Sequence, residues 1–498
     1  MDPVAKVIIL GGGSAGFLAA LALKTKLPDV SVIVIRSKDI GIIGVGEGST
    51  VGLTRFLHNF IAIPQQQFYK IARPTWKLGL RFIWGKRPYF NYTFGPGPDA
   101  NVNGLSRSFG YYCFEDMEYA DPISALMTHD RAFERDGKAP KWHQAIAYHI
   151  ENEFFVSFLE QLALQRGVQI LEDKVIEAPQ DENGLAGLRL ASGRCESADL
   201  YLDCSGFASV LLSKTLGEPF VSFKPSLFND RAVVGGWDRT SEVIKPYTTC
   251  EQMDSGWCWQ IDHEWRINRS YVYSSEFISD EAAEREFRAK NPHVDDTRIV
   301  RFVSGRYRRA WVKNVVAIGN ATGFVEPLEA TALGVIAVQS HLLAECLRES
   351  GRRPGVRSIE QFNRFHADNW DSIRDFLSIH YKFNTALETP YWQACRADAD
   401  LAGAEPIVAC YQENGPTALW EPTLMLPHNQ FKTAGYAALL LGQQVPHRNH
   451  YEPSPEQRRR WEQHRRQCKD AALRGMSVRE ALDVLYSPQW RWAAAPPL

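Results

Sequence analysis

The N-terminal part of the chain alternates apolar runs and polar breaks in the order strand, turn, helix, strand. A glycine-rich turn with G-x-G-x-x-G spacing separates the first strand, which ends at Leu10, from the helix. One glycine permits the tight turn, one lets a pyrophosphate approach the backbone, and one lets helix and strand pack closely. We therefore predict a βαβ dinucleotide-binding unit over residues 4–37, with phosphates at the helix N-terminus. The residues predicted to border the cofactor here are Gly11, Gly13, Ser14, Ala15 and Gly16.

The end of the second predicted strand departs from the usual dinucleotide pattern. An acidic residue that would bind the ribose hydroxyls is expected there, but Arg36 stands in its place. Arg36 is compatible with a phosphorylated ribose, as in NADP, or with the adenosine end of another dinucleotide. It is also compatible with a surface cation at a strand end.

The rest of the chain continues the α/β pattern. We predict a long helix over 146–166, short strands after it, and a strand that ends in Asp203-Cys204-Ser205-Gly206. A second strand, glycine turn and long helix follow from Asn314, and the chain beyond residue 355 is mostly helical. The basic run 458–466 is interleaved with an acid and predicts a solvated helix face. At 498 residues the chain is long enough for two or three lobes.

Residues 75–85, TWKLGLRFIWG, have the period-two pattern of a strand. One predicted face is wholly apolar, and the other carries Lys77, Gly79, Arg81 and Ile83. The simplest interpretation is a half-buried strand with a solvated outer face, on which Lys77 would be an ordinary surface cation.

Composition narrows the class of protein. The net charge of -2 offers no global field for nucleic acid or an anionic membrane. The nine cysteines form no C-x-x-C pair, so zinc and redox motifs are not indicated, and a dispersed odd set predicts reduced thiols in a cytoplasm. We expect no signal peptide and no membrane span.

Three further stretches are informative: GIIGVGEGST at 41–50, SGWCWQID at 255–262 and GFVEPLEAT at 323–331. Together with the N-terminal GGGSAG and the strand at 75–85, they resemble the flavin-dependent halogenases of the tryptophan-halogenase family. The resemblance runs in order to about residue 396 and includes RDFLSIHYKF and ETPYWQACR. It implies an α/β (α+β), glutathione-reductase-like FAD-binding fold with a β-rich substrate lobe and a helical C-terminal lobe. We expect an FAD and substrate module over 1–355, with the substrate lobe interleaved around 75–150 and 220–310, and a C-terminal lobe over 356–498 that closes the substrate pocket.

The resemblance also implies a chemistry and a set of roles. In the family, FAD reduced by a separate flavin reductase reacts with dioxygen and with chloride or bromide to give hypohalous acid, which a lysine delivers to an aromatic substrate. Lys77 matches that lysine, and Glu329 matches a carboxylate that polarises the electrophile or accepts the ring proton. Trp257 and Trp259 match tryptophans that line the passage between flavin and substrate. The further cofactor residues expected are Val45, Gly46, Glu47, Ser49, Thr50, Asp203, Gly206, Gly319, Asn320, Phe324 and Pro327, and the halide residues expected are Thr331 and Ala332.

The chain departs from the family pattern in several places. Asp262 replaces the proline of the G-W-x-W-x-I-P stretch, and Ala330 and Ala332 replace a serine and a glycine, which leaves halide preference open. The clamp that binds the amino and carboxylate groups of free tryptophan is not recognisable in the segment from Glu413. We therefore expect a small phenolic or indolic substrate rather than free tryptophan. Its predicted contacts are Tyr92, Phe94 and Phe431, with Trp420 and Tyr436 as further aromatic lining.

Structural interpretations exist for each motif. The two tryptophans and the aromatics at 92 and 94 are also compatible with core packing, and Glu329 with a carboxylate at a helix N-terminus. The rival functions are an FAD-dependent aromatic monooxygenase, an NAD(P)H-dependent reductase and a non-catalytic relative that retains the fold. No metal, nucleic-acid or membrane partner is expected, and a homodimer follows family habit.

Overall fold

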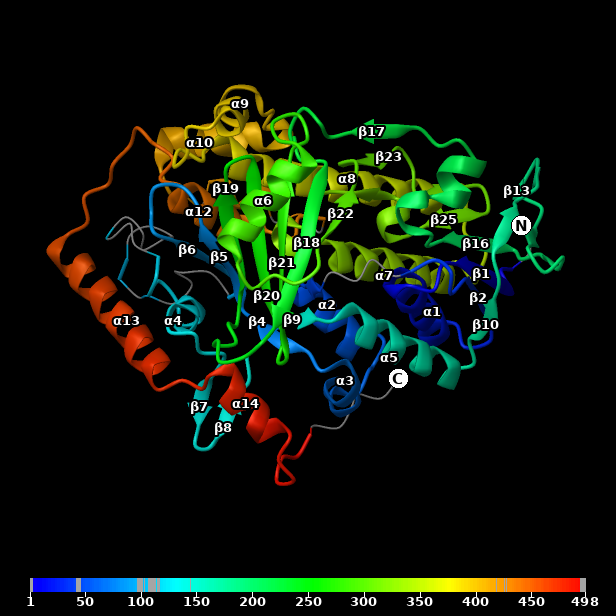
Figure 1. The fold of residues 1–498 in the computed structure, drawn as a ribbon, viewed down its shortest axis with the longest axis horizontal. Helices are drawn as coiled ribbons and strands as arrows, with labels where there is room; N and C mark the ends of the chain where they lie inside the picture. Colours follow the sequence, from blue (N-terminus) through cyan, green and yellow to red (C-terminus); the bar gives the residue numbers. More distant parts are fainter. Residues whose placement is uncertain are drawn as a thin grey trace.

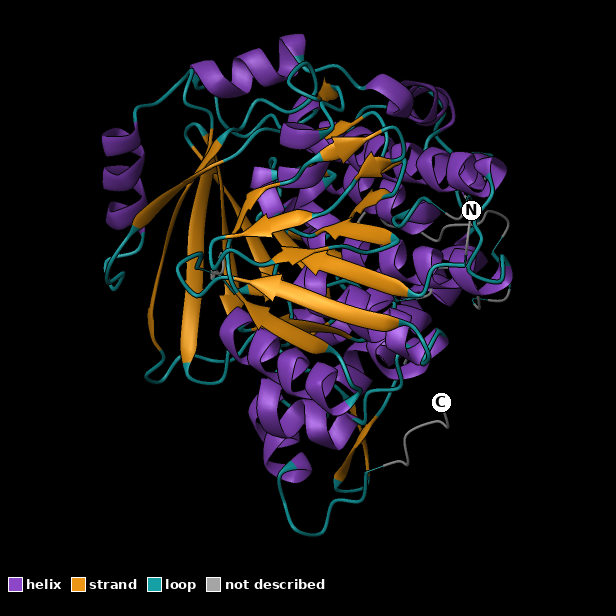
Figure 2. Cartoon of the chain, turned by 90° about the vertical axis from the view of Figure 1, so that its right-hand side faces the viewer, coloured by secondary structure: helices purple, strands orange, loops and turns teal. Residues whose placement is uncertain are grey.

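The computed structural model describes residues 3–41, 46–95, 102, 104–105, 113, 117–143, 145–417, 419–424, 426 and 428–492. Val45, one of the predicted cofactor residues, lies outside the described residues. Strands occupy the middle of the molecule, and helices flank them (Figure 2).

The predicted βαβ unit forms the centre of a six-stranded sheet with the order β10-β2-β1-β16-β25-β24. The first five strands are parallel and β24 is antiparallel, as in a doubly wound dinucleotide-binding domain. The strands of this sheet are β1 (Lys6–Leu10), β2 (Ser31–Arg36), β10 (Gln169–Glu172), β16 (Leu200–Asp203), β24 (Trp311–Val312) and β25 (Val315–Ala317).

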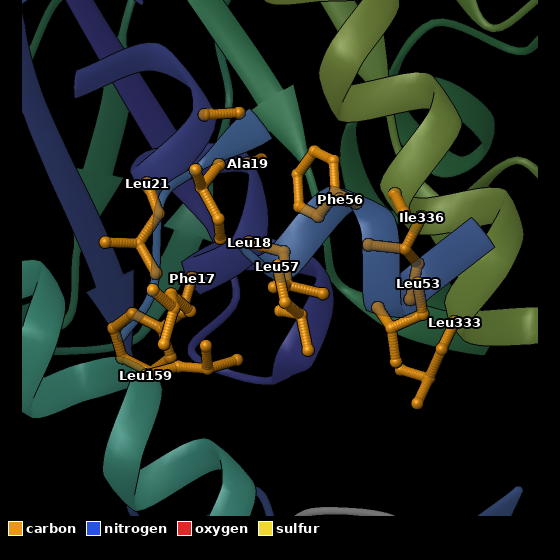
Figure 3. Close-up of a cluster of buried hydrophobic side chains, with 14 of the residues drawn as sticks. Phe17, Leu18, Ala19, Leu21, Leu53, Phe56, Leu57, Leu159, Leu333 and Ile336 are labelled. Atoms are coloured by element: carbon orange, nitrogen blue, oxygen red, sulfur yellow. The ribbon is translucent and has the colours of Figure 1, made fainter. Parts of the chain in front are cut away.

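Three helices pack together beside this sheet: α1 (Ser14–Lys26), α5 (Asn152–Gln165) and α7 (Ala332–Glu349). Figure 3 shows Leu18 of α1, Leu57 and Leu333 in the buried cluster that joins them. The stretch Leu328–Glu349 is the one candidate for a membrane-crossing helix among the described residues, on length and apolar composition. Because 61% of its most apolar window is buried inside the protein, α7 is a core helix here.

A second, seven-stranded sheet has the order β22-β18-β21-β20-β19-β5-β6 and forms the predicted β-rich lobe. Helix α6 (Asp280–Lys290) covers one face (Figure 1), where Cys258 packs in a small apolar cluster. Trp257 and Trp259 point to the other face, because successive strand residues alternate. The strands are β5 (Gly79–Ile83), β6 (Phe90–Thr93), β18 (Arg231–Asp238), β19 (Thr248–Met253), β20 (Gly256–Asp262), β21 (Arg266–Tyr273) and β22 (Arg298–Arg301).

The single strand predicted over 75–85 is wrong. Residues Thr75–Lys77 form β4, which pairs with β9 (Ala147–Ile150) in a three-stranded sheet completed by β3 (Glu47–Gly48). The chain then crosses at Leu78 into β5 of the seven-stranded sheet. The backbone of Leu78 is bound on both sides during this crossing, by the carbonyl of Pro246 and the amide of Phe94. Lys77 consequently lies between two sheets rather than on a solvated face.

The helix predicted over 146–166 is shorter than expected. Its first residues form β9 instead, and α5 begins only at Asn152. Pairing on both edges of β9, with β3 and β4, stabilises the strand over the helical alternative. Buried Tyr148 and His149 thereby become part of the core between the two lobes.

The chain beyond residue 355 is helical, as predicted. Helices α8 and α12 pack on β5 and β6 in one continuous apolar core, so the expected boundary after residue 355 does not separate two cores. Helix α13 carries the basic run on an exposed surface. These helices are α8 (Val356–Lys382), α9 (Pro390–Asp398), α10 (Glu405–Asn414), α11 (Glu421–Leu424), α12 (Lys432–Gly442), α13 (Pro455–Leu473) and α14 (Val478–Leu485).

Smaller elements complete the fold. The helical ones are α2 (Val51–Arg55), η1 (Phe56–Phe60), α3 (Gln65–Ala72), α4 (Pro122–Thr128), η3 (Gly206–Ala208), η4 (Val210–Thr215), η5 (Gly319–Ala321), η6 (Leu328–Ala330) and η7 (Ala402–Ala404). The strands are β7 (Glu134–Asp136), β8 (Ala139–Lys141), β11 (Val175–Glu177), β12 (Gln180–Asp181), β13 (Gly184–Leu185), β14 (Leu188–Leu190), β15 (Cys195–Glu196), β17 (Phe220–Ser222), β23 (Gly305–Tyr307) and β26 (Gly323–Phe324).

Candidate active site

The glycine turn between β1 and α1 has the geometry of a phosphate-binding turn. A Cβ on Gly11, whose φ is +125°, would lie 2.2 Å from the carbonyl oxygen of Cys204, and one on Gly16 would lie 1.9 Å from the carbonyl oxygen of Gly11. Gly13 precedes the first residue of α1, and no atom lies within 4 Å of the place where its Cβ would stand. The N-terminus of α1 is therefore open to a pyrophosphate, and the turn fits a dinucleotide such as FAD.

A cavity of about 890 Å³ extends from this turn across the molecule to the apolar face of β20. The predicted cofactor residues on its wall are Gly11, Gly13, Ser14, Ala15, Arg36, Gly46, Glu47, Gly206, Asn320, Phe324 and Pro327. The predicted halide residues Thr331 and Ala332 also line it, together with Trp257 and Trp259.

Five predicted cofactor residues lie behind the wall. Gly16 packs inside the turn, and Asp203 accepts hydrogen bonds from the backbone amides of Leu211 and Leu212. The hydroxyl of Ser49 accepts from the amide of Tyr148. The others are Thr50, which precedes α2, and Gly319, whose φ is +67°.

Arg36 forms two hydrogen bonds of 2.6 Å with the carboxylate of Glu160. Its charge is thus paired, although the side chain also borders the cavity. Glu47 lies at the same cavity and receives a 2.9 Å hydrogen bond from Asn152, and its burial raises its pKa to about 7.

Lys77 is fully buried one layer behind the cavity wall. Its Nζ would be 3.2 Å from a Cβ on Gly48, beside Ala330 and Thr248, all of which line the cavity. Among the described residues Nζ has no hydrogen-bond partner. Burial lowers the pKa of Lys77 to about 8, and attraction to Glu329 and Cys250 opposes this shift only in part.

Glu329 lies close to this lysine and is also buried. Its backbone has a φ of +71° and that of Ala330 a φ of +55°, so two successive non-glycine residues adopt the left-handed conformation. One carboxylate oxygen lies 3.0 Å from Nε2 of His380, and the other has no hydrogen-bond partner within the described part of the chain. Such strained backbone is characteristic of functional sites.

A second glutamate of the same segment, Glu326, faces the cavity beside Trp257. Its carboxylate accepts hydrogen bonds from Nε1 of Trp257 (3.1 Å), from Nδ2 of Asn229 (2.9 Å) and from the hydroxyl of Tyr381. Burial nonetheless raises the pKa of Glu326 to about 8. Glu326 thus fixes the orientation of Trp257 on the cavity wall.

Three of the predicted substrate aromatics, Tyr92, Phe94 and Phe431, belong to one chain of ring contacts that begins at the lysine. The Lys77 ammonium is 5.3 Å from the centre of the Phe94 ring, and Phe94 is in edge contact with Tyr92. Phe376 of α8 connects the remaining member, because it contacts Tyr92 and stacks on Phe431 with ring centres 3.8 Å apart. Trp420 and Tyr436 belong to the same apolar core.

The departures from the family pattern are accommodated locally. Asp262 is buried and pairs with Arg239 at 2.6 Å, which replaces the apolar contact of a proline with an ion pair. Ala332 is the first residue of α7, where its helical backbone needs no glycine.

Sequence reasoning did not single out four residues of this site: Gly48, Glu326, Phe376 and His380. All four stand inside the quoted stretches GIIGVGEGST, GFVEPLEAT and RDFLSIHYKF, which was the only available signal. Their individual roles depend on contacts between distant segments, which the motifs do not specify.

The fold and cavity define a protein of the FAD-binding α/β class, with a buried lysine and glutamate beyond the far end of the cofactor cavity. Comparison with known proteins gives the same answer. The tryptophan halogenase family model matches residues 6–456. The chain belongs to the tryptophan halogenase family of flavin-dependent halogenases.

Individual relatives support this assignment. The chain is 32% identical over 454 residues to tryptophan 7-halogenase KtzQ of Kutzneria sp. (84% of this chain, 83% of the relative). It is 31% identical over 421 residues to tryptophan 7-halogenase RebH of Lentzea aerocolonigenes (78% of each chain). The solved structure of MibH, a lanthipeptide tryptophan 5-halogenase, is 38% identical with a TM-score of 0.88, and the match covers 97% of this chain and 93% of MibH. The protein is therefore an enzyme that uses reduced FAD from a separate flavin reductase, dioxygen and halide to halogenate an aromatic substrate.

Proposed function

We propose that Lys77 delivers the halogen to the substrate ring and that Glu329 accepts the proton that the ring loses. One observation carries this proposal: a fully buried lysine without a hydrogen-bond partner among the described residues lies close to a carboxylate with one unpartnered oxygen. Proteins rarely bury such groups without a chemical use for them. With a pKa of about 8, most of the Lys77 population at neutral pH is an ammonium that can donate a hydrogen bond to hypohalous acid, and it gives up its proton more readily than an exposed lysine.

The cofactor and the halide are assigned to the cavity. The turn at Gly11–Gly16 and the N-terminus of α1 would hold the pyrophosphate of FAD, and the wall beside Trp257 would hold the flavin end. When bound and reduced, FAD supplies hypohalous acid from dioxygen and halide. Thr331 and Ala332 border the cavity at the N-terminus of α7, where free backbone amides and the helix dipole favour an anion.

Delivery requires the electrophile to pass from the cavity to the lysine. We assign this passage to Gly48, Thr248 and Ala330, because all three line the cavity and a Cβ on Gly48 would lie 3.2 Å from Nζ of Lys77. These side chains are small, so a molecule the size of hypohalous acid has a short route. Trp257 and Trp259 keep a larger aromatic substrate away from the flavin end.

We propose an electron-rich indole or phenol, other than free tryptophan, as the substrate. Support comes from the series of aromatic rings that runs from Phe94, beside Lys77, through Tyr92 to Phe431, because aromatic side chains stack well on a flat aromatic substrate. The similarity to MibH extends the proposal to an indole that is part of a peptide. A homodimer and a cytoplasmic location remain part of the proposal.

The test is a product assay with purified protein, FAD, a flavin reductase, NADH, oxygen and chloride or bromide. The panel contains indoles, phenols, a tryptophan-containing peptide and free tryptophan, and mass spectrometry detects the halogen isotope pattern. We expect halogenated indole or phenol from the wild type, none from Lys77→Ala, and wild-type yield from the exposed control Lys86→Ala. Hydroxylated products would instead establish the aromatic monooxygenase, and preferred turnover of free tryptophan would overturn the substrate proposal.

A further inference from the structure

Two neighbouring residues of α8 hold the two buried glutamates of the segment 326–329. The hydroxyl of Tyr381 donates to Glu326, on the cavity side, and the ring of His380 contacts Glu329, on the lysine side. The side chains of His380 and Glu329 are each only 1% exposed, so no bulk water mediates this contact.

The two ring nitrogens of His380 both face hydrogen-bond acceptors. Nε2 lies 3.0 Å from Oε1 of Glu329, and Nδ1 lies 3.2 Å from the carbonyl oxygen of Phe376. A neutral imidazole carries one N–H, so it can donate to only one of these oxygens. With Glu329 ionised and His380 neutral, one ring nitrogen would present a lone pair to an oxygen lone pair in a site without water, which is costly.

A proton shared between the two side chains removes this conflict. Either His380 carries both protons beside a Glu329 carboxylate, or a protonated Glu329 donates to Nε2 while Nδ1 donates to Phe376. In both forms both contacts become hydrogen bonds. The rings of Phe82, Trp84 and Phe376 surround the imidazole and exclude other hydrogen-bond partners from these sides of the ring.

We propose that His380 is a positioning residue that shares one proton with Oε1 of Glu329 and thereby reserves Oε2 as the oxygen that receives the ring proton. The inference rests on the proposed function of Glu329. Oε2 is the oxygen without a hydrogen-bond partner among the described residues. The titratable groups that face Glu329 from other elements are Lys77 of β4, Tyr92 of β6 and Cys250 of β19.

The proton balance of the reaction is then complete. The ring carbon bonds the halogen of hypohalous acid, and the halogen–oxygen bond breaks to leave hydroxide, which takes a proton from the Lys77 ammonium and becomes water. The ring C–H bond then breaks, its electron pair restores aromaticity, and the proton goes to Oε2. Glu329 then returns this proton to the Lys77 amine. The proton that His380 shares with Oε1 takes no part in these transfers.

The direct test is nitrogen NMR of protein labelled with ¹⁵N-histidine, without cofactor or substrate. The signals of His380 are those lost in His380→Gln, and His293→Gln, at an exposed position, is the matched control. At neutral pH we expect Nδ1 to be protonated and Nε2 to be either protonated or a hydrogen-bond acceptor. An unprotonated Nδ1 with a protonated Nε2 at neutral pH overturns the proposal.

Kinetics supply the second readout. His380→Gln keeps a neutral donor but cannot hold the extra proton, so we expect kcat to fall about 10- to 100-fold with KM within about twofold, and the pH profile of kcat to change shape. An unchanged kcat in a folded His380→Gln protein contradicts the proposal, because a purely structural contact would be rescued by the amide. If the wild type forms no halogenated product, the proposed function has failed. The NMR experiment would still show which ring nitrogens of His380 are protonated.

Discussion

Glu326 and Glu329 belong to one short buried segment, but their surroundings differ. Glu326 faces the cofactor cavity and accepts hydrogen bonds from Asn229, Trp257 and Tyr381. Glu329 lies on the lysine side with one contact, to His380, and an oxygen without a partner among the described residues. A carboxylate whose oxygens are occupied holds structure, whereas one with a free oxygen and strained backbone is available for chemistry.

The same contrast separates the two ends of the site. The cavity end consists of backbone turns and helix N-termini that bind phosphate or halide through geometry. The lysine end consists of buried ionisable groups whose charges are incompletely paired. The first end is stable and general to dinucleotide-binding proteins, and the second is costly and specific to the proposed reaction.

The largest expected effect comes from removing the base. Glu329→Gln should lower the halogenation rate by about 10²- to 10⁴-fold, because the amide cannot accept the ring proton. FAD affinity, measured by fluorescence titration, should change less than about twofold, since Glu329 does not line the cavity. A Glu329→Gln enzyme with a rate near that of the wild type would show that Glu329 is not the base, and the contrast between a structural Glu326 and a catalytic Glu329 would be lost.

For the free energy of unfolding, the loss should be larger when Glu326 is replaced than when Glu329 is replaced. In Glu326→Ala the buried donors of Trp257 and Tyr381 lose their acceptor, whereas Asn229 still donates to the hydroxyl of Tyr381, and the free energy of unfolding should fall by about 3 kcal/mol. Glu329→Ala loses one hydrogen-bond contact, with His380, and the attraction to Lys77, and should cost about 1 kcal/mol. Denaturant unfolding measures both, and an equal loss in the two variants would contradict the structural role of Glu326.

The buried lysine should itself reduce stability. The folded-state pKa of about 8 is below the unfolded value, so the folded protein pays for a buried cation at neutral pH. Lys77→Met should therefore raise the free energy of unfolding by about 3 kcal/mol at neutral pH, with little change in the exposed control Lys86→Met. The advantage should shrink as pH rises from about 8 towards the unfolded pKa of about 10.4, where both states are neutral. A Lys77→Met protein less stable than the wild type would contradict this prediction, because it would mean that other interactions offset the cost of burying the Lys77 charge.

The smallest effect tests the layer between the two ends. In Gly48→Ala the new Cβ would lie 3.2 Å from Nζ of Lys77 and 3.3 Å from Oγ1 of Thr248. Product formation at saturating FAD should fall about 10-fold, which corresponds to about 1.4 kcal/mol in the activation free energy. Gly52→Ala, whose Cβ would be 3.5 Å from the nearest atom, is the control. Equal losses in the two alanine variants would argue against a passage at Gly48.

Much of the cofactor end could be predicted from the sequence. The turn at Gly11–Gly16 depends on local glycine spacing, and the apolar runs on either side of it predict the strand and the helix that the structure contains. Lys77 and Glu329 were predicted through motifs that resemble a family, and the structure brings them together.

The remainder depends on contacts between distant segments. The strand over 75–85 breaks at Leu78 because its two halves pair with different sheets, which its own alternation does not encode. The strand β9 forms because partners on both sides stabilise it. His380 acts through Glu329, far away in the sequence, so its role becomes visible only when α8 lies against the segment 326–329.

The most direct test of the account is a comparison of flavin consumption with product formation in Lys77→Met. Reduced FAD and oxygen are supplied with halide and an indole or phenol that the wild type halogenates, and oxygen uptake and product mass are measured in one reaction. The account predicts that Lys77→Met consumes reduced flavin at the wild-type rate and forms no halogenated product. Halogenated product at the wild-type rate and position from Lys77→Met would contradict it.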